Sequence, residues 1–318
     1  MALARGIRLS GLIEFLVYGL FYTWIWSPPG RSLIGFVTFA VVAFLAVRLL
    51  ATCVSFILAL MHRSPPPKDL RLDSLQWARL VLREYWATLL CYGLLQPWVG
   101  RFGPPAPTRT GTDTGAPVIL VHGFFCNAAY WWGLRRALQA AGIESIYTLS
   151  LEPVYNDIDV FGRQLAERIQ QVLSETGAAQ VLLIGHSMGG LVSRAAVLRH
   201  GQAEHVAGIV TLGTPHFGTA LAMPWSGLNV RQMADHSDWL TELSRQDDSA
   251  APVPVTSIFS YHDNIVAPQE NAILPRAENH AVGGVGHMSL AFDRGIQQRV
   301  IRALRGYRRS CATRSGHA

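Results

Sequence analysis

The chain is 318 residues long, and half of its residues are hydrophobic while only 15% are charged. Soluble domains usually carry about 25% charged residues, so this composition predicts that part of the chain lies in lipid. The net charge of +6 comes from 27 basic residues, which are spread along the sequence without a nucleic-acid-binding motif. The four cysteines show no C-x-x-C pair or metal-ligand spacing. We therefore expect no nucleic-acid partner and no cysteine-bound metal.

Two apolar segments open the chain. Residues 33–61 are interrupted by one charge, Arg48, and as a helix they would be about 43 Å long, enough to cross the ~30 Å hydrocarbon core of a membrane. Residues 11–26 contain Glu14 and would be a marginal span of about 24 Å. We predict that residues 1–66 are a membrane anchor with one or two transmembrane helices.

A cleaved signal peptide is the alternative to an anchor, with Arg5 and Arg8 as its basic region. No small-x-small cleavage site follows Trp26, which favours a retained anchor. The positively charged flanks bear on orientation. Two spans would leave the rest of the chain on the cytoplasmic face, whereas one span would send it outward. We expect two spans in a bacterial inner membrane.

Residues 71–99 change to a helical pattern with an apolar and a polar side. The apolar side holds Leu75, Ala78, Leu82, Tyr85, Trp86 and Leu89, and the polar side holds Asp73, Gln76, Arg83 and Glu84. Such a helix could lie along the membrane or pack against a folded domain. Because residues 101–117 are rich in proline and glycine, we predict an amphipathic helix and a linker over residues 67–115.

From residue 116 onward, short apolar runs alternate with helical patterns such as 160–176 and 190–199. The predicted strands are 118–121, 145–149, 181–184, 209–212, 255–260 and 279–282. This alternation predicts an α/β fold with a mostly parallel sheet of about six strands and helices on both faces. We assign residues 116–308 to one domain and residues 309–318 to a C-terminal tail.

A G-x-S-x-G motif lies at residues 185–189, between an apolar strand and a helical pattern. A tight strand-to-helix turn needs Gly185 and Gly189, because a β-carbon at either position would collide with neighbouring backbone. The turn would hold Ser187 in a strained conformation with its hydroxyl at the helix N-terminus. Ser187 is therefore the predicted nucleophile. The alternative is a glycine-rich turn in which the serine only caps the helix.

Asp263 and His287 are the predicted partners of Ser187. A serine hydroxyl needs a base to take its proton, and the base needs an acid to orient it. Asp263 follows the apolar run 255–260, and His287 lies in a glycine-rich loop. Among the competing histidines, His280 lies in a predicted strand, His262 lies beside the acid, and His216 lies in another turn. The competing acids, Asp235 and Asp238, lie in an irregular insertion.

Two backbone N–H groups are the predicted oxyanion hole. One belongs to Met188, the residue after the nucleophile. The other belongs to Phe124, in the flexible segment that follows the first predicted strand. His122 in the same segment is expected to shape the loop and not to react.

These motifs together resemble the α/β-hydrolase superfamily and, within it, the bacterial lipases and esterases. The residues concerned are VHGF at 121–124, GHSMGG at 185–190, TLGTPHFGT at 211–219, D-x-x-V at 263–266 and GH at 286–287. The chain order serine, aspartate, histidine is also that of this fold. The resemblance implies carboxylic ester hydrolysis on fatty acyl substrates through a serine triad, without a metal or organic cofactor. The sequence departs from the family in lacking a leading pair of antiparallel strands and in being tethered.

The sequence leaves several questions open. Residues 217–250 could form a lid or acyl pocket, or a small core of their own, around Met223, Trp225, Leu228, Trp239, Leu240 and Leu243. The same triad could transfer the acyl group to an alcohol or cleave a thioester, and a non-catalytic scaffold would carry a damaged triad, which is not visible. The substrate-binding residues and protein partners are unknown.

Overall fold

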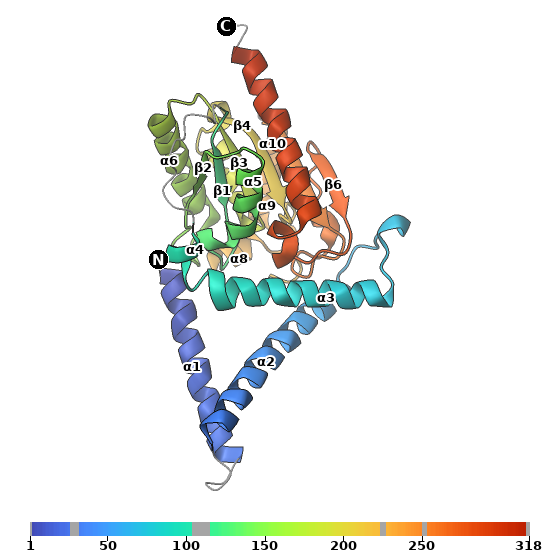
Figure 1. Cartoon of the computed structure of the whole chain (residues 1–318). Helices are drawn as coiled ribbons and strands as arrows, with labels where there is room; N and C mark the ends of the chain where they lie inside the picture. Colours follow the sequence, from blue (N-terminus) through green and yellow to red (C-terminus); the bar gives the residue numbers. More distant parts are fainter. Residues whose placement is uncertain (1, 26–31, 104–114, 223–226, 250–252, 316–318) are drawn as a thin grey trace.

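A parallel sheet of six strands organises the chain after residue 115. The structure is a computed structural model that describes residues 2–25, 32–103, 115–222, 227–249 and 253–315. The strands lie in the order β2-β1-β3-β4-β5-β6, and every neighbouring pair is parallel (Figure 1). They are β1 (Val118–Val121), β2 (Ile146–Thr148), β3 (Val181–His186), β4 (Val206–Leu212), β5 (Val255–Ser260) and β6 (Glu278–Val282). The predicted fold class is thus confirmed.

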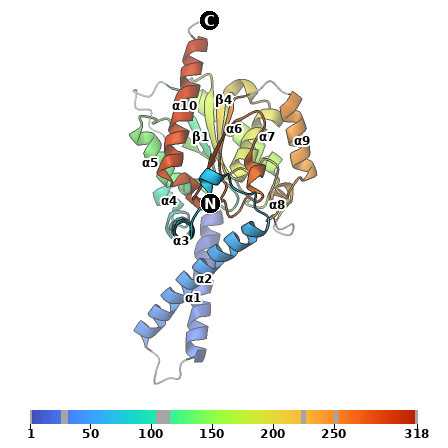
Figure 2. The same ribbon diagram turned by 90° about the vertical axis from the view of Figure 1, so that its right-hand side faces the viewer.

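Both faces of the sheet are buried except at its edge strand β6, which explains the continuous apolar runs in the inner strands. In β1, Val118 and Leu120 enter the core on one face, and Ile119 and Val121 enter the core on the other. The first face is covered by α5 (Trp132–Ala140) and α10 (Arg294–Ser315) (Figure 2). The second is covered by α6 (Ile158–Thr176), α7 (Met188–Arg199), α8 (Leu228–Gln232) and α9 (Asp238–Ser249).

The central strands are longer than their apolar runs. Strand β3 ends at His186, two residues beyond the predicted end, and β4 begins at Val206, three residues before the predicted start. Their parallel pairing includes Gly185 with Thr211 and His186 with Leu212. Backbone hydrogen bonding between the strands therefore extends beyond the apolar residues from which the strands were predicted.

Part of the segment at residues 217–250 belongs to the main core. Leu240 and Leu243 of α9 are buried in the core under α6 and α7, and Trp239 packs against it. Leu228 is exposed. Two other residues of the predicted lid, Met223 and Trp225, lie outside the described residues.

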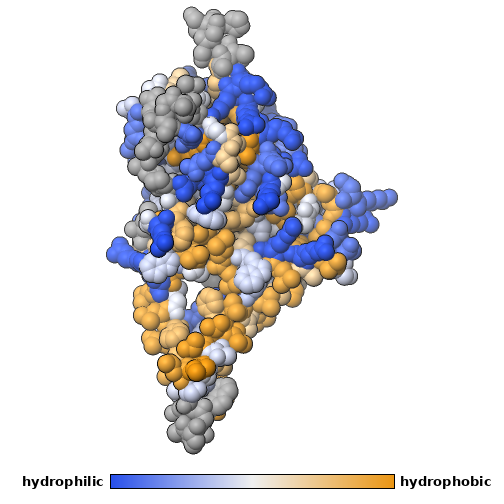
Figure 3. Space-filling model, viewed as in Figure 1, coloured by the Kyte–Doolittle hydropathy of each residue, from blue (hydrophilic) through white to orange (hydrophobic). Residues whose placement is uncertain are grey.

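An antiparallel helical hairpin projects from the domain. Helices α1 (Ala2–Ile25) and α2 (Leu33–Met61) approach each other at the far end and diverge towards the domain (Figures 1 and 2). Apolar residues cover both helices (Figure 3). Within the described ranges, α2 alone is long and apolar enough to cross a membrane by length and composition. Glu14 of α1 and Arg48 of α2 form an ion pair with each other.

Helix α3 (Ser74–Leu89) lies across the open end of the hairpin, beneath the sheet domain (Figure 1). It begins with a capping box between Asp73 and Gln76, and continues into a π-helical segment (Leu90–Leu95) and α4 (Val99–Phe102). Its predicted faces were partly wrong. Glu84 was expected on the solvated side, but it is only 1% exposed and faces the domain.

The exposed side of α3 is instead partly apolar, with Leu75, Leu82 and Trp86 open to the surroundings. The helix wheel sorts residues by polarity, and so cannot detect a polar side chain whose hydrogen-bond partners lie inside the protein. The helix therefore packs on the domain with one side and presents an apolar stripe with the other.

Both ends of the hairpin bind loops at the carboxyl edge of the sheet. The backbone N–H of Ala2 donates to Glu152 Oε1 at 2.8 Å, in the loop after β2. The backbone N–H of Ser64 donates to Gln269 Oε1 at 2.9 Å, in the loop after β5. Because ligands of open parallel sheets bind at this edge, the hairpin meets the domain where a functional site is expected.

Leu165→Ala tests the core beneath α6. Leu165 is fully buried, so the substitution removes apolar contacts and leaves a cavity. We expect a loss of about 2–5 kcal/mol in the free energy of unfolding, measured by denaturant unfolding in detergent. Gln171→Ala, at an exposed position of the same helix, is the control and should change this value by less than about 0.5 kcal/mol. Equal effects of both substitutions would contradict the described packing.

Candidate active site

Ser187 lies in the sharp turn between β3 and α7. Its φ is 54° and its ψ is −125°, a conformation that costs energy for a residue with a side chain. Its backbone N–H donates to Leu212 O at 2.9 Å. A β-carbon on Gly185 would lie 2.5 Å from the backbone nitrogen of Gly190, and one on Gly189 would lie 2.0 Å from Val121 O. The packing therefore requires both glycines, as predicted from the motif.

Asp263 and His287 form a buried pair in the loops after β5 and β6. His287 Nδ1 and Asp263 Oδ2 are 2.8 Å apart. The other carboxylate oxygen of Asp263 accepts the backbone N–H groups of Ile265 and Val266, each at 2.8 Å. The carboxylate is thus fixed by its own loop and aimed at the imidazole.

The pair lies at the same end of the sheet as Ser187. A β-carbon on Gly213, the residue after Leu212, would lie 3.0 Å from Asp263 Oδ2 and 3.4 Å from His287 Nδ1. The ring of His186, which precedes the serine, has its centre 4.6 Å from that of His287. The structure therefore brings the three predicted residues to one place.

Electrostatics distinguish His287 from the other histidines. Burial lowers the pKa of His287, but the charge and hydrogen bond of Asp263, together with the charge of Glu84, outweigh it, so the pKa is raised above 6.5. Burial lowers the pKa of His122 and of His262 to about 4. It lowers the pKa of His186 and of His216 well below 6.5. These four rings are thus neutral at pH 7, whereas His287 is suited to hold a proton.

The competing acids and the last competing histidine make other contacts. Asp235 accepts a hydrogen bond from Asn271 Nδ2 at 2.6 Å, and Asp238 lies in the first turn of α9. His280 lies in β6 beside Glu278, at 3.0 Å. No cluster of three metal-ligating side chains occurs in the described part of the chain.

The predicted oxyanion hole lies next to the serine turn. Met188 is the first residue of α7, where backbone N–H groups have no partner inside the helix. Phe124 follows β1, in a loop that His122 shapes: the Leu151 N–H donates to His122 Nε2 at 3.1 Å, and His122 Nδ1 lies 2.9 Å from Gly123 O. Within the described residues, the backbone N–H groups of Phe124 and Met188 donate no hydrogen bond.

An aromatic rim borders the oxyanion loop. The ring centres of Phe124, Phe125 and Tyr155 lie 5.8–6.4 Å from one another. Phe125 and Tyr155 are exposed. Tyr155 was not predicted, because it lies in an irregular loop without a motif, although the two adjacent phenylalanines were a signal.

Polar side chains that were not predicted from the sequence support the Asp–His pair. The His287 backbone N–H donates to Asn264 Oδ1 at 3.0 Å, and Asn264 Nδ2 donates to Ser55 Oγ of α2 at 2.8 Å. Gln269 Nε2 donates to the backbone carbonyl of Asp263 at 2.9 Å. The hairpin and the loops of the Asp–His pair therefore share one hydrogen-bond network.

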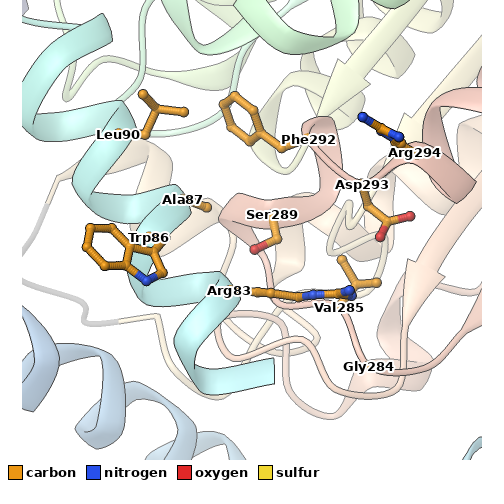
Figure 4. Close-up of a pocket in the computed structure, with 10 residues that line it drawn as sticks. All are labelled: Arg83, Trp86, Ala87, Leu90, Gly284, Val285, Ser289, Phe292, Asp293 and Arg294. Atoms are coloured by element: carbon orange, nitrogen blue, oxygen red, sulfur yellow. The ribbon is translucent and has the colours of Figure 1, made fainter. Parts of the chain in front are cut away.

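A cavity of about 490 Å³ lies beside this network, between α3 and residues 284–294 (Figure 4). Arg83 and Trp86 line it from α3, and Ser289 and Phe292 line it from the other side. Ser187, Asp263 and His287 are not among its lining residues. The cavity thus borders the loop that carries His287 without opening on the candidate site.

Asp263→Asn tests the origin of the raised pKa of His287. Without the carboxylate charge, burial dominates and the pKa of His287 should fall below that of the parent protein. NMR titration of isotope-labelled imidazoles in detergent would follow the ring, with Asp238→Asn as a control at a distant acid. An unchanged titration of His287 in the Asp263 variant would contradict this account.

Comparison with known proteins agrees with the fold. A family model described as the PGAP1-like alpha/beta domain matches residues 156–293. A triacylglycerol lipase of Burkholderia plantarii is 42% identical over 131 residues, which is 37% of this chain and 35% of the lipase. The chain thus spans about a third of the length of that relative.

Two solved structures share the architecture. Lipase B of Aspergillus fumigatus has a TM-score of 0.56 and 22% identity, over 63% of this chain and 55% of that protein. The mature lipase BlEst2 of Bacillus licheniformis has a TM-score of 0.53 and 20% identity, over 64% of this chain and 96% of that protein. The chain thus shares the α/β-hydrolase fold of these two lipases and is similar in sequence, over about a third of its length, to a triacylglycerol lipase.

Proposed function

We propose that this protein is a membrane-anchored serine hydrolase that cleaves carboxylic esters of fatty acyl chains. The observation that carries the proposal is the buried hydrogen bond between His287 and Asp263 at the end of the sheet where Ser187 lies. The raised pKa of His287 supports its role as the base. The similarity to proteins named as triacylglycerol lipases supports an ester as substrate.

In the proposed reaction, Ser187 Oγ attacks the ester carbonyl while its proton passes to His287 Nε2. The N–H groups of Phe124 and Met188 stabilise the oxyanion. The acyl–oxygen bond then breaks, and His287 gives its proton to the leaving alcohol. Water, deprotonated by His287, attacks the acyl-enzyme and releases the fatty acid. Asp263 orients the imidazole and stabilises its positive charge.

The surface around the site favours an apolar acyl group. Phe124, Phe125 and Tyr155 form an aromatic rim next to the oxyanion loop. Covering exposed aromatic surface with an acyl chain removes it from water, at about 25 cal/mol per Å². The affinity for the ester should therefore increase with acyl length.

The hairpin supports a membrane anchor with two spans. Its two ends, at Ala2 and Ser64, both bind the domain, so α1 and α2 would cross the bilayer in opposite directions. Pairing Glu14 with Arg48 reduces the cost of holding either charge in lipid. The basic flanks then favour a domain on the cytoplasmic face of a bacterial inner membrane.

Ser187→Ala tests the reaction. We expect detergent-solubilised protein to hydrolyse p-nitrophenyl esters of two to sixteen carbons with a kcat/KM that rises with chain length. The variant should lose at least about 10³-fold in kcat, because it lacks the nucleophile, and should keep its thermal unfolding temperature. Ser74→Ala, at an exposed serine of α3, should retain parental activity. Full activity of the Ser187 variant would refute the proposal.

Ser32→Cys tests the two-span anchor. Ser32 caps the start of α2, so in a two-span hairpin it lies on the side of the membrane opposite the domain. In intact cells, a membrane-impermeant maleimide should label this variant above the level of the parent chain. Arg71→Cys, an exposed position on the domain side, should be labelled only after permeabilisation. The reverse pattern would exclude the proposed orientation.

A further inference from the structure

Glu84 of α3 binds the loop that carries His287, although it lies about 200 residues earlier in the chain. Its Oε1 accepts the backbone N–H of Met288 at 2.7 Å. Its Oε2 accepts the backbone N–H of Ser289 at 3.0 Å and the Ser289 hydroxyl at 2.7 Å. Figure 4 shows the side chain of Ser289 directed towards α3. One carboxylate therefore binds the two residues that follow His287.

The residue before His287 also packs against this carboxylate. A β-carbon on Gly286 would lie 2.5 Å from Glu84 Oε2 and 2.6 Å from its carboxyl carbon. Any larger residue at position 286 would displace either the carboxylate or the loop. Gly286, which the sequence placed only in a glycine-rich loop, thus lets the Glu84 carboxylate pack against the residue before His287.

The environment of Glu84 is unusual for a side chain that only stabilises the fold. It is fully buried, and burial raises its pKa, against the lowering effect of the hydrogen bonds from Ser289 and Met288. Among the described residues, no basic side chain pairs with it as a salt bridge. A buried charge without a cation is costly, and here three donors from the His287 loop compensate for it.

We propose that Glu84 is a positioning residue that fixes the His287 loop and so holds the imidazole in register with Asp263 and Ser187. The inference rests on the proposed function, in which His287 is the base. With Asn264 holding the His287 backbone N–H, the loop is bound from two sides. Removing the carboxylate would leave two buried N–H groups without acceptors, which is costly, and the loop would move to satisfy them.

Glu84 also acts on His287 through its charge. The titratable side chains that face His287 are Asp263 from the β5 loop, Glu84 from α3 and His186 from β3. The negative charges of Asp263 and Glu84 both raise the pKa of His287. A role in packing alone would leave the titration of His287 unchanged, so the pH profile separates the two roles.

Glu84→Gln in the full-length, detergent-solubilised protein tests the inference. The amide keeps the size of the side chain but replaces an acceptor by a donor opposite Ser289. We expect kcat for a p-nitrophenyl ester to fall about 10–100-fold, as for a misplaced catalytic group. The KM should change by less than about threefold, because the substrate-binding surface is untouched. The acid limb of kcat/KM should shift to lower pH, because a negative charge near His287 is lost. Glu167→Gln, the same change at an exposed position of α6, should leave both quantities unchanged.

Glu84→Asp keeps the charge and shortens the reach. It should lower kcat while the acid limb of kcat/KM stays close to that of the parent, and it replaces the glutamine variant as the test if the latter does not fold. Parental kcat in a folded Glu84 variant would overturn the inference. So would a loss of activity with an unshifted pH profile in Glu84→Gln. If the parent itself hydrolyses no ester, the proposed function fails, and this is seen before any Glu84 variant is compared.

Discussion

The arrangement of the candidate site depends on the hydrogen bond between His287 Nδ1 and Asp263 Oδ2. Both groups are buried, and the carboxylate, 2.8 Å from the ring, raises the pKa of the imidazole against the lowering effect of burial. A parallel sheet makes this possible, because its strands all end at one edge and bring together loops that are distant in the sequence. Ser187 joins them from β3, where the strained turn fixes its place.

The N-terminal helices are part of the same support. Asn264 donates a hydrogen bond to Ser55 of α2. Met288 and Ser289 donate hydrogen bonds to Glu84 of α3, so each loop of the Asp–His pair is bound by acceptors outside the sheet domain. The loops after β5 and β6 contain backbone donors that the strands cannot satisfy. Helices that resemble a simple tether in sequence thus complete the polar network of the candidate site.

The fold could be predicted from the sequence because its signals are local. Apolar runs marked the first five strands, although β6 (Glu278–Val282) has none. The serine motif marked the turn after β3, where Gly185 and Gly189 are required by close backbone contacts. The roles of Ser187, Asp263 and His287 stay a prediction that the geometry supports.

Glu84 could not be predicted, because polarity placed it on the solvated side of a helix while its partners lie about 200 residues away. The extent of β4 was also missed, since Gly208 carries no strand signal. A local sequence pattern cannot predict contacts between residues that are distant in the sequence.

The two ends of the hairpin bind on either side of the candidate site, at Glu152 and at Gln269. In a protein anchored in this way, the site would be held at a fixed height above the bilayer and would meet its substrate in two dimensions. The fraction of ester among the surrounding lipids, and not its bulk concentration, would then set the rate of encounter. The released fatty acid would enter the same leaflet, so product and substrate would compete for one surface.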